Sequence, residues 1–362
     1  SDVCSSDLPT QQGANAPFVP FGTFVAQQPD AKGPATYTWN LSVQHQFGKD
    51  WLLSAAYMGT QSAHIWVSRQ LNPAIIVPCA NGVLTSCNTT GNTNQRRIAY
   101  LANPTAAATL GPTDMFESGG TSNYNGMILT AQKRLNRGVS FNANYTWSHC
   151  IGDVPVGSNV GGAGGTYTDV NDRRRDRGNC STPTLDGNQT LDRRHIFNLT
   201  SVLEAPKFKS TLLRLTASNW KFSTSYRYLS AAYLTVTSGV DVALSGASGQ
   251  RPNLIAASPF CADRNAGCWL DRNAFGSATA GTLGNLGRSN IAGPGFFGVD
   301  MALSRIFRLR ETMTLEARGE AFNVSNSFRA GPVTSALNNN NFGRILTAQD
   351  PRIMQVALKL LF

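Results

Sequence analysis

The chain has 362 residues, a formal net charge of +10, only 14% charged residues and a mean hydropathy of −0.20. Soluble domains contain roughly 25% charged residues, so this chain is unusually poor in ionic groups, yet it has no run of about 18 apolar residues that would predict a transmembrane helix. The basic residues are spread along the chain apart from one cluster at 173–177, which argues against a nucleic-acid-binding groove.

The first 36 residues differ from the rest. Residues 1–8, SDVCSSDL, resemble a translated sequencing-adapter tag and are treated as non-native. They contain neither the basic region nor the apolar region of a secretory signal peptide. Residues 9–36 are rich in Pro, Gly and Gln and predict a loop with part of a strand in the apolar stretch 18–25. If the protein is exported, this start indicates a fragment whose native beginning is missing.

A clear period of two begins at residue 37. Tyr37, Trp39, Leu41, Val43 and Phe47 are apolar, and the residues between them are polar except near His45. Alternate residues of a strand point to opposite faces, so this pattern predicts a strand with one apolar face. A tight turn at 48–50 and a second strand from residue 51 complete a hairpin.

The hairpin pattern then recurs to the end of the chain. Further strands are predicted around 127–135, 139–147, 197–203, 220–228, 297–307, 315–321 and 352–362. Short turns lie at 48–50, 136–138 and 308–311, an intermediate connection at 206–218, and long connections at about 67–122, 150–192, 239–293 and 325–351. Loops beyond about 12–15 residues are uncommon in compact soluble domains, whereas outer-membrane barrels pair short periplasmic turns with long external loops.

The last strand has the length and pattern of a membrane-crossing strand. Its apolar face consists of Met354, Val356, Leu358, Leu360 and the terminal Phe362, and about ten residues of tilted strand cross a bilayer core. Aromatic residues occur at strand ends, as expected of interfacial girdles: Trp51, Tyr57, Tyr145, Trp147, Trp220, Tyr226 and Tyr228. The sequence therefore predicts an all-β protein, an antiparallel transmembrane β-barrel of the outer-membrane type, present as a C-terminal fragment of about eight or nine strands.

Several phrases follow one another in a familiar order: YTWNLSVQHQFGKDWLLSAAYMGTQSAHI, YNGMILTAQKRLNRGVSFNANYTWSH, LDRRHIFNLT, GRSNIAGPGFFGVDMALSRIFRL, LEARGEAFNVSN and the terminal strand. This set resembles the C-terminal barrel portion of TonB-dependent outer-membrane receptors of the Oar-like type, over residues 36 to 362. The resemblance implies a parent with a 22-stranded barrel and an N-terminal plug. Residues 37–362 would then be the C-terminal part of the barrel, with the plug absent.

The resemblance also implies a function and partners. The intact parent would bind a scarce nutrient and import it by energy-coupled transport, contacting the TonB complex through the missing N-terminal part. The ligand class stays open between a small molecule, a saccharide and a peptide. Other expected partners are outer-membrane lipid, lipopolysaccharide and the barrel-assembly machinery, which would read the terminal strand. An alternative is a small closed barrel acting as a structural anchor or adhesin, in which the first strand pairs with residues 352–362.

Six cysteines outside the tag fall into three sequence-local pairs: Cys79 with Cys87, Cys150 with Cys180, and Cys261 with Cys268. Each pair lies within or brackets one long connection. An oxidising cell surface favours disulfides, although spacing alone fixes no connectivity and free cysteines remain the alternative.

Two charged groups are candidate sites. Arg173, Arg174, Arg175 and Arg177 lie in a long connection and could bind an anionic substrate or lipopolysaccharide phosphates, since Arg binds phosphate through two parallel hydrogen bonds; the alternative is internal pairing within the loop. Glu316, Arg318 and Glu320 point away from the apolar face of their strand, so they would face the barrel lumen or the plug, or form an ion-pair ladder there.

No motif of catalysis is present. GxSxG, HExxH and CxxC do not occur. His149 and Asp153 lie near a strand end and could belong to an outer-membrane hydrolase, but a solvated loop mouth explains them better. His195 follows Asp192, Arg193 and Arg194, which are interpreted as a charge cluster at the start of a strand. The sequence predicts no enzyme, no cofactor, no metal site and no nucleic-acid partner.

Overall fold

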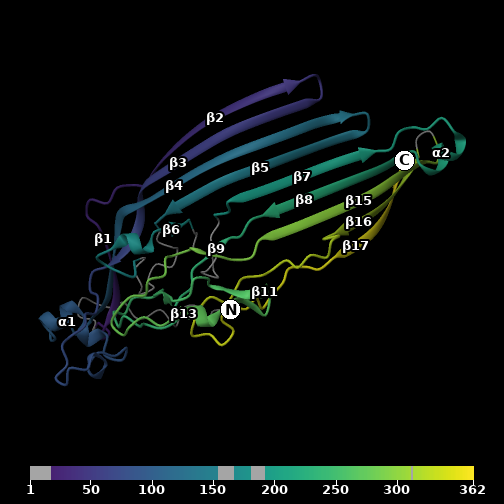
Figure 1. Ribbon diagram of the computed structural model, residues 1–362. Coiled ribbons are helices and arrows are strands. Elements are labelled where there is room, and N and C mark those ends of the chain that lie inside the picture. Colours follow the sequence, from purple (N-terminus) through teal and green to yellow (C-terminus); the bar gives the residue numbers. More distant parts are fainter. Residues whose placement is uncertain (1–17, 154–166, 181–191, 311–312) are drawn as a thin grey trace, which may run out of the picture.

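The computed structural model describes residues 18–153, 167–180, 192–310 and 313–362. Its main feature is a long curved sheet with the strand order β2-β3-β4-β5-β7-β8-β15-β16-β17, in which each strand is antiparallel to its neighbours (Figure 1). The strands are β2 (Ala35–Phe47), β3 (Trp51–Gln70), β4 (Leu110–Asn136), β5 (Val139–Gly152), β7 (His195–Glu204), β8 (Trp220–Leu229), β15 (Phe296–Arg308), β16 (Thr314–Phe322) and β17 (Ile353–Leu361). Two short strands join the sheet off this path: β1 (Gly22–Gln27) beside β4 and β6 (Gly178–Asn179) beside β5.

The register gives the whole sheet one apolar face. Leu360 of β17 lies opposite Leu315 of β16, which lies opposite Phe307 of β15. Many of these side chains are open to the surroundings: Leu41 is 69% exposed and Val356 is 84% exposed. An apolar surface that extends over nine strands is far larger than soluble proteins expose, and it matches a lipid-facing surface.

Aromatic rings lie at two levels on this face. Trp51 and Phe141 pack with ring centroids 5.3 Å apart near the short turns. Phe197, Tyr226 and Phe297 form a chain at the other level, with centroid distances of 5.5 and 5.3 Å. On β5, Phe141 and Tyr145, the residue opposite Phe197, are four residues apart, or about 13 Å. Both levels therefore fit within the apolar band of about 25 Å of outer-membrane barrels.

The sheet does not close on itself. Within the described residues, β2 pairs only with β3 and β17 pairs only with β16, so these two strands form free edges. A small closed barrel requires pairing between the first and last strands of this chain. The described residues form no such ladder.

Two sequence expectations about connections need correction. The connection at 67–122 is shorter than expected, because β3 continues to Gln70 and β4 starts at Leu110. The extra length is held by continued pairing and by the 2.9 Å ion pair between Arg69 and Glu117. The connection at 206–218 contains a short helix, α2 (Thr211–Thr216).

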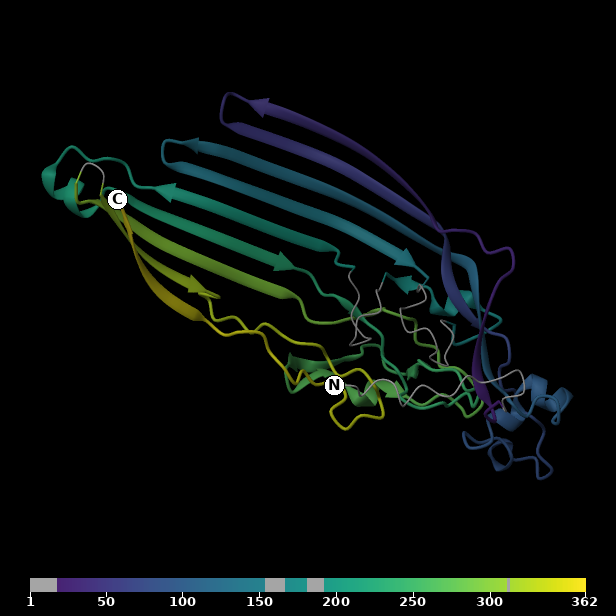
Figure 2. The same cartoon turned by 180° about the vertical axis from the view of Figure 1, so that it is seen from behind.

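The remaining long connections fold together at the end of the sheet opposite α2 and the short turns (Figures 1 and 2). We call this region the loop body; it consists of residues 71–109, 167–180, 230–295 and 323–352. It contains α1 (Ile98–Ala102), the 3₁₀ turns η1 (Leu84–Ser86), η2 (Asn94–Arg96), η3 (Arg173–Asp176) and η4 (Arg272–Ala274), and the strands β9 (Tyr233–Leu234), β10 (Asn253–Leu254), β11 (Phe260–Asn265), β12 (Cys268–Leu270), β13 (Phe275–Gly276) and β14 (Ile291–Ala292).

The loop body has a buried apolar core. Its centre is formed by Leu234, Val236, Leu270, Ala274, Phe275, Leu286, Ile291, Val333, Phe342 and Ile345. These residues come from two connections that are separated in sequence by β15 and β16, so the core ties the loops to one another. No helix in the described part of the chain is long and apolar enough to cross a membrane.

Candidate functional site

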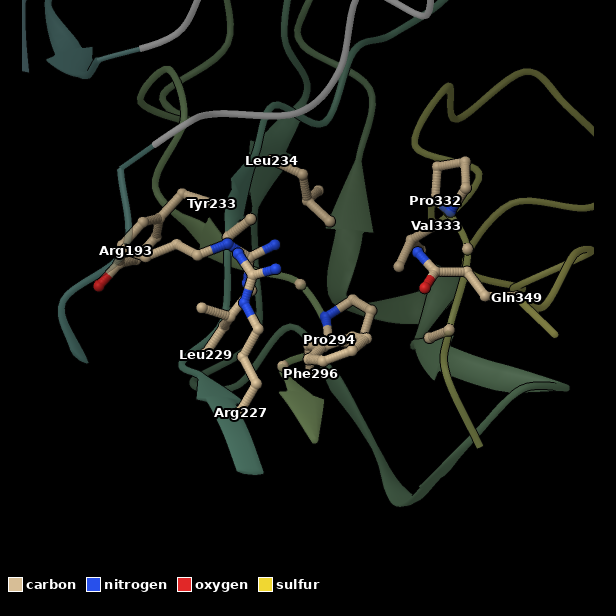
Figure 3. Close-up of a pocket in the computed structure, with 15 residues that line it drawn as sticks. Arg193, Arg227, Leu229, Tyr233, Leu234, Pro294, Phe296, Pro332, Val333 and Gln349 are labelled. Carbon is tan, nitrogen blue, oxygen red and sulfur yellow. The ribbon is translucent and has the colours of Figure 1, made fainter. Parts of the chain in front are cut away.

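A cavity of about 340 Å³ lies where the sheet meets the loop body (Figure 3). Its wall combines two arginines, Arg193 and Arg227, with apolar residues and one amide. The other lining residues are Leu229, Ala232, Tyr233, Leu234, Gly293, Pro294, Gly295, Phe296, Ala330, Gly331, Pro332, Val333 and Gln349. We call this cavity the junction pocket.

Strand register places one of the two arginines. Arg227 lies near the end of β8, opposite Asn198 of β7 and Gly298 of β15. These positions belong to the polar face of the sheet, because Tyr226 and Tyr228 on either side belong to the apolar face. In a closed barrel the polar face lines the lumen. The Arg227 side chain therefore lies on the polar side of the sheet.

The other arginine is fixed by a backbone contact. Arg193 precedes β7, and its Nη1 donates a hydrogen bond of 2.5 Å to the carbonyl oxygen of Ser230 at the end of β8. This contact turns the guanidinium toward Arg227, and Figure 3 shows the two groups next to one another. Burial lowers the pKa of Arg193, and the positive charge of Arg227 lowers it further.

Neither guanidinium has an acidic partner among the described residues: no carboxylate there lies within 4.0 Å of Arg193 or Arg227. The nearby acids belong to other groups. Asp192 is 3.7 Å from Arg194 and 3.5 Å from His149, and Asp300 is 3.6 Å from Arg329. Within the described residues, the two positive charges of the pocket are therefore not compensated by any carboxylate.

The rest of the wall is mainly apolar. Leu229, Leu234, Pro294 and Phe296 face the arginines, and the side-chain amide of Gln349 lies on the opposite wall (Figure 3). Small-molecule sites usually combine such an apolar surface with a few polar groups that fix orientation. Chemically, the junction pocket can hold a negative group at one end and an apolar body at the other.

The six predicted cysteines form three disulfides in the structure. Cys79 bonds to Cys87 between β3 and β4, with Cα atoms 5.6 Å apart. Cys150 at the end of β5 bonds to Cys180 after β6, at 5.3 Å. Cys261 and Cys268 join β11 to β12, at 6.0 Å. All three staple the external connections, and none lies in the membrane-crossing part of a strand.

The basic cluster at 173–177 does not form an open anion site. Arg175 donates to the carbonyl oxygen of Gly284 at 2.6 Å, and Arg173 donates to that of Gly119. Arg177 contacts Asp153 at 3.2 Å and the Thr121 hydroxyl at 2.6 Å. The contact of Arg177 with Asp153 is pairing within the loop, whereas the other contacts join the segment to neighbouring connections. Arg174 alone of the four donates no side-chain hydrogen bond within the described residues.

Glu316, Arg318 and Glu320 lie on the polar face of β16. Arg318 pairs with Glu320, and Glu320 also accepts a hydrogen bond from Gln355 of β17. Glu316 lies opposite Lys359 in the register. Their positions match an ion-pair ladder, and contact with a plug stays a prediction. Met354, Val356, Leu358, Leu360 and Phe362 lie on the apolar side of the edge strand, and their reading by assembly machinery also stays a prediction.

The hydrolase candidates are separated. His149 Nδ1 faces Asp192, whereas Asp153 contacts Arg177 and the backbone N–H of Thr121. Across the described residues no group of three His, Cys, Asp or Glu side chains is arranged to hold a metal ion. Sequence reasoning missed the junction pocket, because it treated Arg193 as part of a charge cluster and did not single out Arg227. A basic residue between two aromatics in a strand was the available signal.

Comparison with solved structures gives distant likenesses. The outer membrane transporter YddB from Escherichia coli has a TM-score of 0.42 and 10% identity, covering 94% of this chain and 34% of that protein. The ferric-catecholate import receptor Fiu from E. coli has a TM-score of 0.41 and 10% identity, with coverages of 92% and 28%. The ferripyoverdine receptor of Pseudomonas aeruginosa has a TM-score of 0.42 and 11% identity, with coverages of 91% and 27%. This chain thus spans about a third or less of each.

No curated protein matches the sequence. The profile of one family, described as outer membrane beta barrel domain, matches residues 3–355, which is nearly the whole chain. That match agrees with the antiparallel sheet, its apolar face and its two levels of aromatic rings. The chain therefore belongs to the outer membrane beta barrel domain family, and its location is the outer membrane.

Proposed function

We propose that this chain is the C-terminal part of the barrel of a TonB-dependent outer-membrane receptor of the Oar-like type. Residues 37–362 supply nine barrel strands and the loop body, residues 9–36 belong to the preceding loop, and residues 1–8 are a non-native tag. The parent binds a scarce nutrient at its outer face and imports it by energy-coupled transport through a plug. This chain performs no chemistry on the nutrient.

The observation that carries the proposal is the open sheet. Nine antiparallel strands share one apolar face, and both edge strands, β2 and β17, lack a partner within the described residues. Lipid does not tolerate unpaired backbone groups at a sheet edge, so a membrane-embedded arc needs further strands to close it. A parent of 22 strands, which the sequence resemblance implies, would supply them.

The partners follow from the same proposal. The edge strand β17 ends in Phe362, which is 93% exposed, and it is the segment that barrel-assembly machinery would recognise. The Glu316, Arg318 and Glu320 side chains would line the lumen beside the plug. The apolar face contacts lipid and the loop body contacts lipopolysaccharide. The TonB complex would act through the N-terminal part of the parent.

The gene tests the proposal directly. We expect the nucleotide sequence upstream of residue 9 in the source genome to continue the reading frame through further strands, a plug and a signal peptide. A signal peptide joined directly to residue 9 would contradict the receptor assignment.

Expression of residues 9–362 alone supplies an independent test. Because two edges would face lipid, we expect no heat-modifiable, protease-resistant species in outer membranes, whereas co-expression with the upstream strands should restore it. Stable insertion of the chain by itself would mean that nine strands suffice, and the proposal would fail.

A further inference from the structure

We infer that the junction pocket binds an oxyanion, a carboxylate or a phosphate, on a small ligand whose apolar body rests on the wall formed by Leu229, Pro294 and Phe296. The inference deepens the proposed function, on which it rests, by naming the chemical class of the ligand that the receptor takes up.

The junction pocket carries two positive charges. Arg193 and Arg227 line the same cavity with adjacent guanidinium groups, and the described part of the chain offers neither of them a carboxylate within ion-pair distance. Two like charges repel, and the partial burial of Arg193 removes water that would screen them. An oxyanion between the two groups would relieve both effects, and a guanidinium can donate two parallel hydrogen bonds to such a group.

The two arginines are held in place before any ligand arrives. The 2.5 Å hydrogen bond to Ser230 fixes Arg193. The backbone of Arg227 is fixed because β8 is paired with β7 on one side and with β15 on the other. The loop arginines at 173–177 differ, because their guanidinium groups mostly bind carbonyl oxygens of neighbouring loops. Arg193 and Arg227, by contrast, line a cavity.

The size of the junction pocket limits the ligand that it can hold. A volume of about 340 Å³ lies near the lower end of the roughly 300–1,000 Å³ range of small-molecule sites. This space accepts one ring or a short chain with its charged group, but not a folded peptide or a long saccharide. Because the pocket opens on the polar face of the sheet, a ligand leaving the loop body on its way into the lumen would meet it.

The experiment uses the protein expressed from its complete gene and purified from outer membranes in detergent. Equilibrium binding is measured for phenyl phosphate, hippurate, inorganic phosphate and the neutral benzyl alcohol. We expect saturable binding of phenyl phosphate, hippurate or both, weaker binding of inorganic phosphate and none of benzyl alcohol. The phosphate and carboxylate probes distinguish the two sources of the oxyanion. Binding should weaken as salt is raised from about 0.05 to about 0.5 M.

Variants assign the binding to the pocket. Arg227→Gln should weaken binding at least about tenfold, because a charge-assisted bidentate contact is lost, and Arg227→Lys should restore part of it. Arg193→Gln should act in the same direction. The matched control Arg174→Gln removes a like charge at the same end of the molecule, and its binding should equal that of the unchanged protein. Heat-modifiable migration verifies folding of each variant.

Three outcomes would overturn the inference: no saturable binding of any anionic probe, equal binding by Arg227→Gln and the unchanged protein, or equal loss in Arg174→Gln. Uptake is measured separately in cells. Binding without energy-dependent uptake would contradict the receptor function and leave the pocket intact, whereas uptake without anion binding would contradict the pocket and leave the receptor function intact.

Discussion

The sheet and the loop body are stabilised in different ways. Side chains of the sheet such as Leu41 and Val356 point outward, so its apolar surface is covered by lipid rather than by protein. The loop body instead buries Leu270 and Val236 almost completely and contains a buried ion pair between Asp176 and Arg251 at 2.5 Å. The stability of the sheet depends on the lipid around it, and the stability of the loop body depends on its own buried interior. Substitutions should therefore be able to destabilise one region without the other.

The largest expected effect is in the buried ion pair of the loop body. Asp176 is 1% exposed and accepts hydrogen bonds from Arg251 and from the backbone and hydroxyl of Thr168. Asp176→Asn leaves the Arg251 charge uncompensated, so we expect a loss of about 3–5 kcal/mol in loop-body stability. Thermolysin cleavage of the loops measures it. The exposed Asp263→Asn is the control, and equal cleavage of both variants would contradict the expectation.

The disulfides should rank by loop length. Cys150–Cys180 closes 30 residues and Cys261–Cys268 closes 7. In the chain-entropy model these loops correspond to about 3.6 and about 2.4 kcal/mol. Replacing both cysteines of each pair by serine should therefore raise loop cleavage more for the first pair. The heat-modifiable migration of the protein, which reports folding of the sheet, should not change in either variant. If loop cleavage rose more for the second pair than for the first, chain entropy would not set the ranking.

A charge on the lipid side should affect the sheet alone. Leu199 of β7 lies on the apolar face opposite Tyr226, and Thr200 beside it points to the polar face. A charge on the lipid side costs about 2–4 kcal/mol at the bilayer midplane and less toward the interfaces, so Leu199→Arg should reduce the heat-modifiable fraction. Thr200→Arg is the matched control. If the two variants behaved alike, the assignment of faces would be wrong.

The smallest expected effect is in the ion pair on β16. Arg318 is exposed, with 49% of its side chain accessible, and pairs with Glu320. An exposed pair of this kind contributes about 0–1 kcal/mol, so Arg318→Gln should leave both loop cleavage and sheet migration nearly unchanged in detergent. A clear fall in uptake by cells, with unchanged stability, would then assign this residue a role in the lumen.

The two regions also differ in how much the sequence predicts. Period-two alternation predicted the strands, because whether a residue of a strand such as β2 is apolar or polar depends only on the face on which it lies. The loop body has no period, and its core joins residues as distant as Leu234 and Phe342. The cysteine pairs could be predicted from the sequence because the two members of each pair are close in sequence.

The junction pocket was not predictable for the same reason. Arg193 and Arg227 are brought together by the β7–β8 pairing and by a contact with Ser230, and the apolar wall comes partly from Pro294 and Val333 in later connections. The extension of β3 and β4 was missed because the regular apolar alternation of the membrane-crossing part does not continue through it. In water, strands can continue to pair where that alternation has ended.

The extension of β3 and β4 contributes to how far the protein projects from the membrane surface. From Gly59 to Gln70, β3 continues past the level of the outer aromatic rings; β4 pairs with it, and β1 pairs with β4. The eleven residue steps from Gly59 to Gln70 span up to about 36 Å. A large particle approaching the bacterium would therefore contact these strands, or the connection 71–109 that they carry, before it reached lipid. The extension therefore separates the surface that large particles contact from the junction pocket, which only a small solute can enter.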